Sequence, residues 1–487
     1  MGAFRRSGVS GFLVASIFLS ASCVRNPVTG GRQLALISEA QEKAIGEASH
    51  PEILAEFGMV EDPQLQEYFS RIGLELAGIS HRPQLAWKFT VLDTPVVNAF
   101  AVPGGYIYLT RGILGHMNNE AEMAGVVGHE IGHVTARHSV TQLSQQQLLG
   151  LGLGIGSILS PTFRQLGSLA ETGLSVLLLK YSRDHERQSD QLGLQYMSQA
   201  GYDPSQVSRF FELFERMSEG EGERLPNWLS SHPAPPDRVK ATSALAEKIK
   251  QENAGRQFKV NAEQLMERVD GIVFGDNPRE GYVEQGKFLH PDLRFQLDVP
   301  QGWKVQNTKS VVTFLEPNGG AAIQLTLVPP KSGETPEAVA AAIRNQEGVQ
   351  FIEGDRIQIA GANAYVGRYR VQDSQGGIVA VLAAFVPYNK NMYQIAGLTS
   401  ESAFSTYARS FENTIRGFRQ LSDPRILAVQ PDRIRVQTAK KGDTLRSISG
   451  IQKTSRITIE ELSLLNRLDP DQPLASGARV KVVRPGR

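Results

Sequence analysis

The chain has 487 residues, which is enough for two or three domains of ordinary size. Its apolar content is 41% and its charged content is 21%, as is normal for a globular protein. The formal net charge is +1, so the chain lacks the basic balance of a nucleic-acid-binding protein, and we expect no nucleic acid among its partners.

The first 22 residues have the pattern of a secretory signal. Arg5 and Arg6 precede an apolar core that is too short for a transmembrane helix. The only cysteine of the chain, Cys23, ends a Ser20–Cys23 segment that resembles a bacterial lipobox, although Leu is usual where Ser20 stands. We expect a signal peptide at 1–22 and lipidation of Cys23, which would anchor the chain to a membrane. Cleavage that leaves a soluble protein is the alternative.

Two short strands are predicted at 99–102 and 106–110. Both runs are apolar, and Pro103–Gly105 between them is a turn signal. An edge strand at this position can bind an extended peptide through its backbone, whereas an ordinary hairpin would only pack against the next helix. The candidate substrate-binding residues are Asn98, Ala99, Phe100 and Ala101.

The most informative motif is H-E-x-x-H at 129–133, in a segment with helical apolar spacing. Residues four apart lie on one helix face, so His129 and His133 can hold one Zn2+ at roughly 2.0–2.1 Å each. Glu130 can act as general base toward a water whose pKa zinc lowers to about 7. We therefore expect one zinc ion per chain. A solvated helix with unrelated histidines is the alternative, and the apolar neighbours disfavour it.

The apolar, glycine-rich stretch 148–160 follows this helix. It is too short to span a bilayer comfortably, and its glycines weaken a helix. We expect a short helical lid over the cleft, or a buried helical hairpin.

A charged helical segment downstream supplies a candidate third ligand, which a zinc peptidase needs beside an open position. Glu186 and Asp190 are four apart, so Glu186 can bind the metal while Asp190 accepts the outer N–H of a ligand histidine. His185 is an alternative ligand, and a solvated charged face is the alternative to a site.

His232 lies among four prolines, which stiffen the backbone around it. It could occupy the fourth zinc position as a latch, or stand beside the zinc and stabilise the oxyanion. A hydrogen-bonded loop histidine without a catalytic role is the third possibility. We favour the latch.

The pattern changes near residue 256, where a helical linker and an α+β module begin. Predicted helices lie at 261–270, 335–346 and 402–415, and predicted strands lie at 295–299, 311–315, 322–327, 378–386 and 392–398. The pattern and a Pro-x-Gly-Trp element at Pro300–Trp303 resemble PsbP-like or Mog1-like sheet domains. No catalytic constellation is expected there.

In the last fifty residues, the pattern predicts the end of a strand, a turn and the start of a helix at 440–448, a second helix at 460–466 and a strand at 474–483. Their G-D-T-L, L-x-x-L-N and G-x-x-V-K-V elements resemble a LysM module. That resemblance implies a βααβ fold and peptidoglycan as a partner. A degenerate module used only for packing is the alternative.

H-E-x-x-H followed by Y-S-R-x-x-E-x-x-x-D resembles the gluzincin zinc metallopeptidases of the HtpX/Oma/BepA-like family. Asn26–Leu34, Asn98–Tyr108 and Ser231–Pro233, with Arg238 shortly after, resemble further segments of that family. Ser189 departs from the usual Ala. The roles implied by the resemblance are zinc ligands for His129, His133 and Glu186, the base for Glu130, and support behind a ligand for Asp190.

We therefore expect a multidomain α+β chain. Residues 23–255 would form a mostly helical zincin-type peptidase domain, 256–425 the linker and small α+β sheet domain, and 433–487 the βααβ LysM-like module. The resemblance implies a zinc endopeptidase that cleaves unfolded or misassembled envelope proteins, in the periplasm and lipid-anchored to the outer membrane. A chaperone or assembly factor for outer-membrane proteins with latent protease activity is the alternative, and a peptidoglycan hydrolase is less favoured.

Overall fold

The computed structural model describes residues 23–148, 180–219, 228, 232, 237–328, 334–372, 377–451 and 457–486. The predicted signal peptide, the predicted lid beyond Leu148 and the prolines around His232 lie outside the described residues. Of the helices described, none is both long and apolar enough to cross a membrane.

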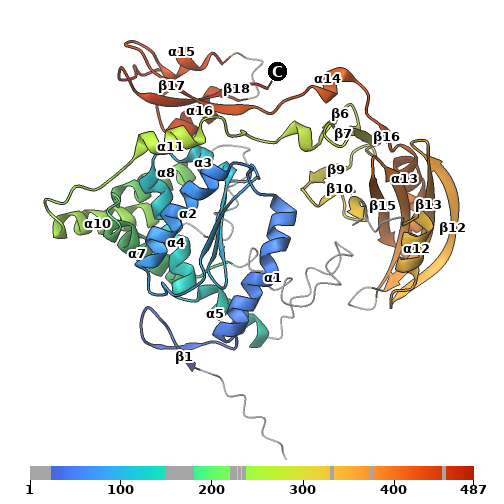
Figure 1. Ribbon diagram of the computed structural model, residues 1–487, viewed down its shortest axis with the longest axis horizontal. Coiled ribbons are helices and arrows are strands. Elements are labelled where there is room, and N and C mark those ends of the chain that lie inside the picture. The colour runs from blue at the N-terminus through green and yellow to red at the C-terminus, as the bar shows by residue number, and fades with distance from the viewer. Residues whose placement is uncertain are drawn as a thin grey trace, which may run out of the picture.

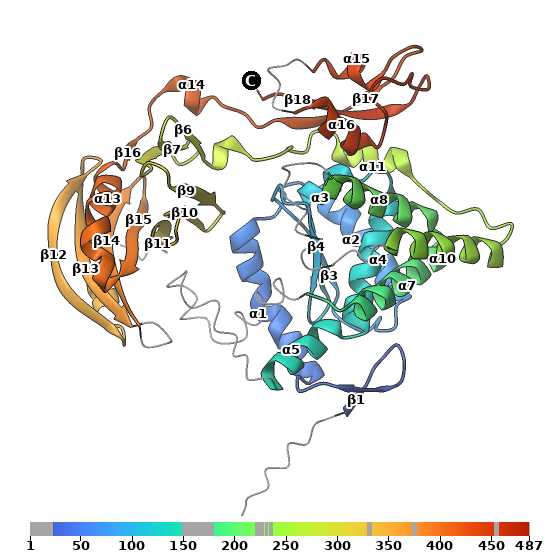
Figure 2. The ribbon, with the colours of Figure 1, turned by 180° about the vertical axis from the view of Figure 1, so that it is seen from behind.

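The N-terminal domain consists of helices around a three-stranded sheet, as Figures 1 and 2 show. β3 (Lys88–Leu92) runs parallel to β5 (Tyr106–Thr110), and β4 (Ala99–Val102) pairs antiparallel with β5 and forms an edge of this sheet. Both predicted strands are thus confirmed. The helices are α1 (Glu39–Phe57), α2 (Pro63–Gly78), α3 (Arg111–His116), α4 (Glu120–Thr135), α5 (His138–Leu148), α7 (Arg183–Gln199), α8 (Ser205–Glu219) and α10 (Arg238–Glu252).

The helix α4 carries the H-E-x-x-H motif and is buried along its whole length. The Asn119 side chain caps its first turn by accepting a hydrogen bond from the backbone N–H of Glu122. α7 packs directly against it, and a side chain at Gly193 would place its Cβ only 2.8 Å from the backbone nitrogen of His129. The glycine therefore allows the two helices to approach closely enough for α7 to present Glu186 to the histidines.

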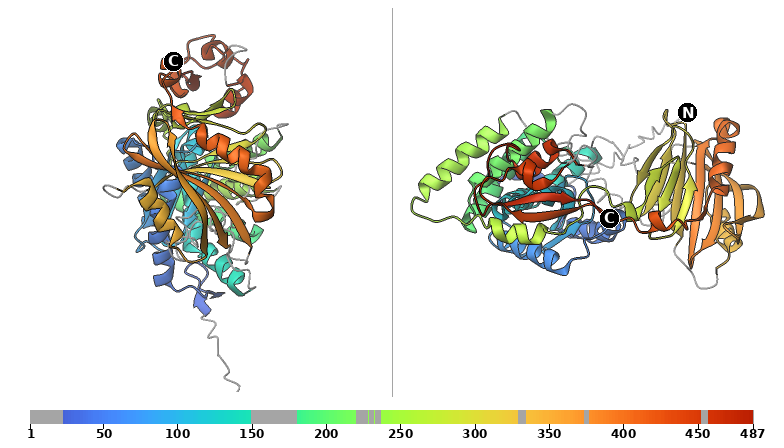
Figure 3. Two further views of the ribbon diagram at one scale, coloured as in Figure 1. Left: turned by 90° about the vertical axis from the view of Figure 1, so that its right-hand side faces the viewer. Right: turned by 90° about the horizontal axis from the view of Figure 1, so that it is seen from above.

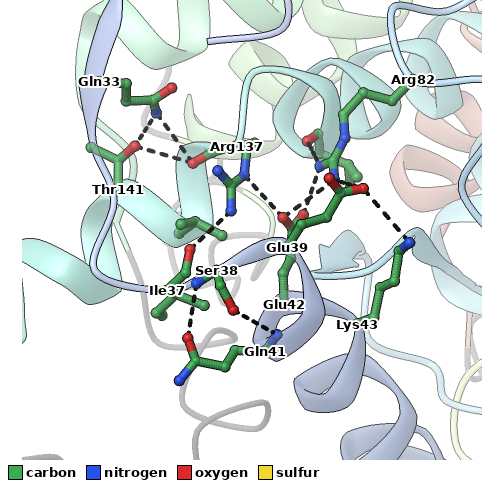
Figure 4. Close-up of polar contacts among 12 residues, drawn as sticks. Gln33, Ile37, Ser38, Glu39, Gln41, Glu42, Lys43, Arg82, Arg137 and Thr141 are labelled. Atoms are coloured by element: carbon green, nitrogen blue, oxygen red, sulfur yellow. Dashed lines mark hydrogen bonds and ion pairs between the residues drawn. The ribbon is translucent and has the colours of Figure 1, made fainter. Parts of the chain in front are cut away.

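The C-terminal end of α4 is held by a buried ionic cluster, shown in Figure 4. Glu42 of α1 accepts hydrogen bonds from Arg82 at 2.7 Å and from Arg137 at 2.9 Å. Arg82 also donates to the carbonyl of Val134, one of the last carbonyls of α4, at 3.1 Å. All three charged side chains are buried, so the cluster fixes the end of the helix against α1.

The segment before α1 reinforces this end of α4. β1 (Cys23–Arg25) and β2 (Arg32–Leu34) form a short antiparallel pair. The Asn26 side chain donates to the carbonyl of Ala136 at 3.2 Å, and Gln33 contacts Thr141 of α5. The beginning of the described chain is thereby attached to residues 136–141, which follow the H-E-x-x-H motif.

The sheet module has two sheets. The larger has the strand order β12-β13-β14-β15-β11-β10-β9 and the smaller β16-β8-β7-β6. Its elements are β6 (Tyr282–Glu284), β7 (Lys287–His290), β8 (Phe295–Asp298), β9 (Lys304–Asn307), β10 (Val311–Leu315), β11 (Ala321–Val328), α12 (Pro336–Arg344), β12 (Val349–Ile359), β13 (Ala362–Gln372), β14 (Ile378–Tyr388), β15 (Asn391–Ser400), α13 (Phe404–Arg416) and β16 (Arg419–Gln420), with a 3-10 turn at η3 (Pro278–Glu280) and another at η4 (Glu401–Ala403).

Each face of the larger sheet has its own apolar cluster. Leu382 and Ala384 of β14 pack with residues of α13, whereas Ala383 and Phe385 pack with residues of α12. The alternation along β14 places one helix on each face. The predicted helices and strands of this module are confirmed, while the long strands β12 and β13 were not predicted.

The C-terminal module has the predicted βααβ order. β17 (Arg433–Thr438) pairs antiparallel with β18 (Arg479–Arg484), and α15 (Leu445–Ser449) and α16 (Ile459–Asn466) lie between them in sequence. The last strand begins at Arg479 instead of the predicted residue 474, because the chain turns at Ser476 and Gly477, where Gly477 has a φ of +87°.

The C-terminal module lies on the N-terminal domain, and the sheet module lies to one side of both (Figures 1 and 3). α11 (Ala262–Val269) packs against α4 and against both strands of the C-terminal module. After α11 the chain continues into the sheet module and comes back through the short helix α14 (Pro424–Leu427). The outgoing and returning segments are joined by a hydrogen bond from the backbone N–H of Ile434 to the carbonyl of Ile272.

Candidate metal centre

Four buried side chains converge beside α4. His129, His133, Glu186 and His232 each offer one ligand atom, and these atoms lie within 4.8 Å of one another. The two Nε2 atoms of His129 and His133 are 3.0 Å apart. The Glu186 carboxylate lies 3.4 Å from His133 Nε2 and 3.6 Å from His129 Nε2. Ligands of a tetrahedral zinc ion are about 3.3 Å apart, so these spacings fit a zinc ion.

The polar atoms of this cluster also fit a metal ion. Both carboxylate oxygens of Glu186 and one of Glu130 are buried without a hydrogen bond from the described part of the chain. Burial lowers the pKa of His129, His133 and His232 well below the ordinary value, so each imidazole is neutral and keeps a lone pair. Neutral imidazoles and unsatisfied carboxylate oxygens are the donors that zinc takes in proteins.

The charges around the cluster leave room for a dication. Three carboxylates, of Glu130, Glu186 and Asp190, face a single guanidinium, that of Arg238. With neutral histidines, full ionisation of the three carboxylates would give this group a net charge of −2, which is the charge that Zn2+ balances. Burial and the neighbouring Glu186 carboxylate raise the pKa of Glu130 to about 8. A cation in the cluster would lower it again, because opposite charge favours the carboxylate.

Asp190 makes the contact that its spacing from Glu186 predicts. Its Oδ1 lies 2.9 Å from Nδ1 of His129, so the imidazole donates through Nδ1 and presents the Nε2 lone pair to the cluster. Arg238, the first residue of α10, holds Asp190 with hydrogen bonds of 2.6 and 2.8 Å and lies 3.0 Å from Glu186. The guanidinium thus links the candidate ligand on α7 to the group behind His129.

Aromatic side chains enclose the cluster. The His232 ring stacks on Trp228, with centroids 4.9 Å apart, and the backbone N–H of His232 donates to the Trp228 carbonyl at 2.8 Å. The Tyr181 ring lies 3.9 Å from the His133 ring. His232 Nε2 is 3.6 Å from the Glu130 carboxylate, so His232 reaches both the candidate base and the candidate ligands.

The structure also decides the position of His185. It lies outside the four-residue cluster and stacks on His138, with ring centroids 4.2 Å apart. His185 follows Ser182, the N-cap of α7, on the side of the helix that faces α5. Glu186 is therefore the member of this pair that faces the histidines of α4.

The predicted substrate strand lies beside this centre. β4 contacts α4, and the backbone N–H of Trp228 donates to the carbonyl of Val97, just before Asn98, at 3.3 Å. Ala99, Phe100 and Ala101 are buried, and Asn98 is half-buried. Their use by a substrate stays a prediction.

Sequence reasoning did not find the roles of Arg238, Tyr181, Trp228 and His138 at the centre. Their positions depend on how α10, α5 and the segments around them pack, and residue spacing within one helix carries no information about that. The nearest signal for Arg238 was its place shortly after His232 in the family resemblance. His138 lies close to the motif in sequence but beyond the end of α4.

Comparison with known sequences agrees with this geometry. Residues 63–246 match peptidase family M48, and residues 438–483 match the LysM domain. The beta-barrel assembly-enhancing protease of Yersinia pestis is 28% identical over 233 residues, which cover 46% of this chain and 48% of that protein. The mitochondrial metalloendopeptidase OMA1 of Schizosaccharomyces pombe is 30% identical over 220 residues, which cover 44% of this chain and 64% of that protein. The chain spans less than two thirds of either relative.

Among solved structures, cyanobacterial PsbP (CyanoP) from Synechocystis sp. PCC 6803 has 16% identity and a TM-score of 0.23, and covers 29% of this chain and 91% of its own. The Ran-binding protein Mog1p of Saccharomyces cerevisiae has 10% identity and a TM-score of 0.21, and covers 26% of this chain and 91% of its own. TM-scores of this size establish no shared fold, so the PsbP-like or Mog1-like character of residues 256–425 stays a prediction.

The M48 match contains the H-E-x-x-H helix, Glu186, His232 and Arg238, and the LysM match contains both helices of the C-terminal module. The donor set is one that suits zinc, the metal on which M48 peptidases depend. Residues 63–246, which match peptidase family M48, thus hold the buried His–Glu cluster, and the module that matches the LysM domain packs against them.

Proposed function

We propose that this protein is a zinc-dependent endopeptidase of the bacterial cell envelope that cleaves unfolded or misassembled envelope proteins. The observation that carries the proposal is the buried cluster of His129, His133 and Glu186 with Glu130 beside it, inside an M48 domain. The name of the Yersinia pestis relative, a beta-barrel assembly-enhancing protease, supports an envelope role in outer-membrane protein quality control.

The proposed roles follow from the contacts. His129, His133 and Glu186 would hold the zinc ion, which supplies Lewis-acid chemistry that polarises a peptide carbonyl and acidifies water. Glu130 takes the proton from the attacking water and returns it to the leaving amine nitrogen. Asp190 and Arg238 keep His129 in the tautomer that faces the metal. Asn98–Ala101, at the sheet edge beside α4, would pair with the backbone of an extended substrate.

His232 is proposed to act as a latch. Its ligand atom lies within 4.8 Å of the ligand atoms of the three proposed zinc ligands. The protein therefore offers four donors, and a zinc ion held by all four would have no position left for water. A catalytic zinc site keeps one open position. Displacement of His232 would therefore open the site, and the segment that carries it also contacts the start of the substrate strand.

The location and partners are part of the same proposal. Lipidation of Cys23 would anchor the protein to the outer membrane on its periplasmic side. Cys23 begins β1, which is attached to the end of α4, so the anchor would hold the peptidase domain near the membrane surface. The LysM domain suggests peptidoglycan as a further partner.

A second candidate from a different class is a chaperone or assembly factor for outer-membrane proteins with latent protease activity. The latch geometry of His232 favours it, since a site with four protein donors is off by default. A peptidoglycan hydrolase is less favoured, because the motif and the family match are those of peptidases that cleave proteins.

Zinc content and casein cleavage by the purified chain test the proposal. Glu130→Gln should keep one zinc per chain and lose hydrolysis, because only the base is removed. Glu186→Ala should lose zinc while the fold is retained. Full zinc and full activity in Glu186→Ala would overturn the ligand assignment. In cells, a Glu130→Gln protein that retains function would favour the chaperone.

The latch makes an opposite prediction from an oxyanion stabiliser. His232→Ala should raise cleavage of an unfolded substrate if His232 is the latch. The same change should lower the rate by roughly 10²–10³ if His232 stabilises the oxyanion. An unchanged rate would leave His232 without a catalytic role.

A further inference from the structure

His138 lies behind the second histidine of the motif although it is not on the same helix. α4 ends at Thr135, and Arg137 adopts a left-handed backbone with a φ of +57°. This residue turns the chain so that α5 starts at His138 and its imidazole returns toward His133. The side chain is buried, with 1% exposure, and its ring stacks on His185.

The contacts of His138 form a chain of three side chains. Its Nδ1 lies 3.1 Å from Nδ1 of His133, the nitrogen that faces away from the cluster. Its Nε2 lies 2.9 Å from the side-chain oxygen of Gln188, on α7. Two ring nitrogens at the distance that separates the two Nδ1 atoms form a hydrogen bond only when one of them carries the proton and the other keeps a lone pair.

Gln188 determines which nitrogen donates and which accepts in this series of hydrogen bonds. Its amide oxygen only accepts, so His138 must carry its proton on Nε2 and leave a lone pair on Nδ1. That lone pair accepts the Nδ1 proton of His133, which leaves the Nε2 lone pair of His133 facing the cluster. The reverse chain would place the proton of His133 on Nε2, where a metal could not bind.

We propose that His138 is a positioning residue that fixes the metal-binding tautomer of His133, and that Gln188 sets the direction of the Gln188–His138–His133 chain. The inference rests on the proposed zinc site. It gives the second ligand histidine a support equivalent to the one that Asp190 gives His129.

The test measures the zinc affinity of the full-length protein by competition with a chromophoric chelator. His138→Leu removes the acceptor and should weaken zinc binding by about 10–100-fold. His138→Asn places an amide oxygen near the Nδ1 position and should recover most of that loss. A purely structural role would give no such recovery. His138→Leu with wild-type zinc affinity would overturn the proposal.

Gln188 provides a variant that leaves the buried ring in place. It is half-buried, so Gln188→Met should fold normally while removing the acceptor, and zinc binding should weaken several-fold. Gln188→Glu keeps an acceptor and should bind zinc at least as tightly as the wild type. The matched control is Gln191→Met, an exposed position one turn further along α7, which should change nothing. Equal affinities of Gln188→Met and Gln191→Met would overturn the role of Gln188.

The outcomes separate this inference from the proposed function. A wild-type protein that binds no zinc would contradict the zinc-peptidase proposal itself. A wild-type protein that binds zinc and cleaves casein, with every His138 and Gln188 variant unchanged, would contradict only the tautomer chain.

Discussion

The LysM domain and the sheet module contact the peptidase domain in different ways. One continuous apolar cluster contains Leu462 and Leu465 of the LysM domain together with Leu114 and Met117 of the peptidase domain. The sheet module has separate clusters, and its nearest polar contacts to the peptidase domain are Lys309 with Asp93 at 3.0 Å and Ser310 with Glu56. The LysM domain is therefore part of the peptidase core, and the sheet module is attached through its surface.

A buried lysine of the LysM domain also makes hydrogen bonds to the peptidase domain. Lys481 of β18 has no exposed surface and donates to the carbonyls of Gly115 at 2.6 Å and Met117 at 3.0 Å. These carbonyls end α3, immediately before the zinc helix, so a LysM side chain caps a helix of the peptidase domain. Burial lowers the pKa of Lys481 well below its usual range, and both its charged and neutral forms retain the two N–H donors that the carbonyls require.

Shortening an apolar side chain in the shared core tests the comparison most strongly. Leu465→Ala, at a fully buried LysM position, should destabilise the peptidase domain by about 2–5 kcal/mol. In a Trp303→Phe background, tryptophan fluorescence comes only from Trp87 and Trp228 of the peptidase domain, and urea unfolding followed by this signal measures the loss. The matched control, Phe314→Ala in the sheet module, should leave that signal unchanged. An unaffected midpoint in Leu465→Ala would contradict the shared core.

The buried lysine should have a slightly smaller effect. Lys481→Met keeps the apolar stem but leaves two buried carbonyls without a donor, and should lower the free energy of unfolding by about 2–4 kcal/mol. The loss should appear in the same fluorescence signal. Lys441→Met, at an exposed position of the same domain, is the control and should be neutral. If both variants unfold at the wild-type urea concentration, the helix cap contributes nothing to the peptidase domain.

The same lysine shows what sequence reasoning could not predict. In the run Val480–Val483, Lys481 alternates with apolar residues as an exposed residue of a half-buried strand would. It is buried because α3 of another domain covers it, and the local pattern contains no trace of that neighbour. β12 was missed for a related reason, since its charged, exposed positions and the irregular register after Phe351 hide the alternation of an edge strand.

In the metal centre, too, some contacts could be predicted from the sequence and others could not. His129 with His133, and Glu186 with Asp190, are pairs four apart in one helix, so local geometry predicts that each pair shares a face. The structure brings these four residues and His232 together. Arg238 and His138 reach the centre from other helices, and the left-handed Arg137 breaks the helical period before His138. Spacing predicts contacts within an element, and packing between elements decides the rest.

The Asp93 carboxylate, which pairs with Arg111 and with Lys309 of the sheet module, should make the free energy of unfolding depend on pH. Burial alone would raise the pKa of Asp93, but Arg111 and Lys309 outweigh it and hold the pKa below its ordinary value. A carboxyl whose pKa is lowered on folding contributes stability above its unfolded value, about 3.9, and loses it as the pH falls through the folded pKa. Unfolding free energies measured from pH 6 to pH 3 should therefore fall less steeply in Asp93→Asn. Identical slopes would show that this carboxylate is not paired in solution.

The smallest effect is expected for the ion pair that joins the sheet module to the peptidase domain. Lys309→Met removes the contacts with Asp93 and Glu280, yet all three side chains remain partly exposed, and pairs of this kind contribute about 0–1 kcal/mol. The urea midpoint of the peptidase signal should stay close to that of the control Lys304→Met, at an exposed position of the same module. Small-angle scattering should instead show a slightly wider distribution of distances, because the Lys309 side-chain contact is lost while the contact of Ser310 with Glu56 and the two backbone connections near Ile272 and Ile434 remain. A loss of stability above about 2 kcal/mol would exceed what an exposed pair can supply, and the sheet module would then have to be counted with the LysM domain as part of the peptidase core.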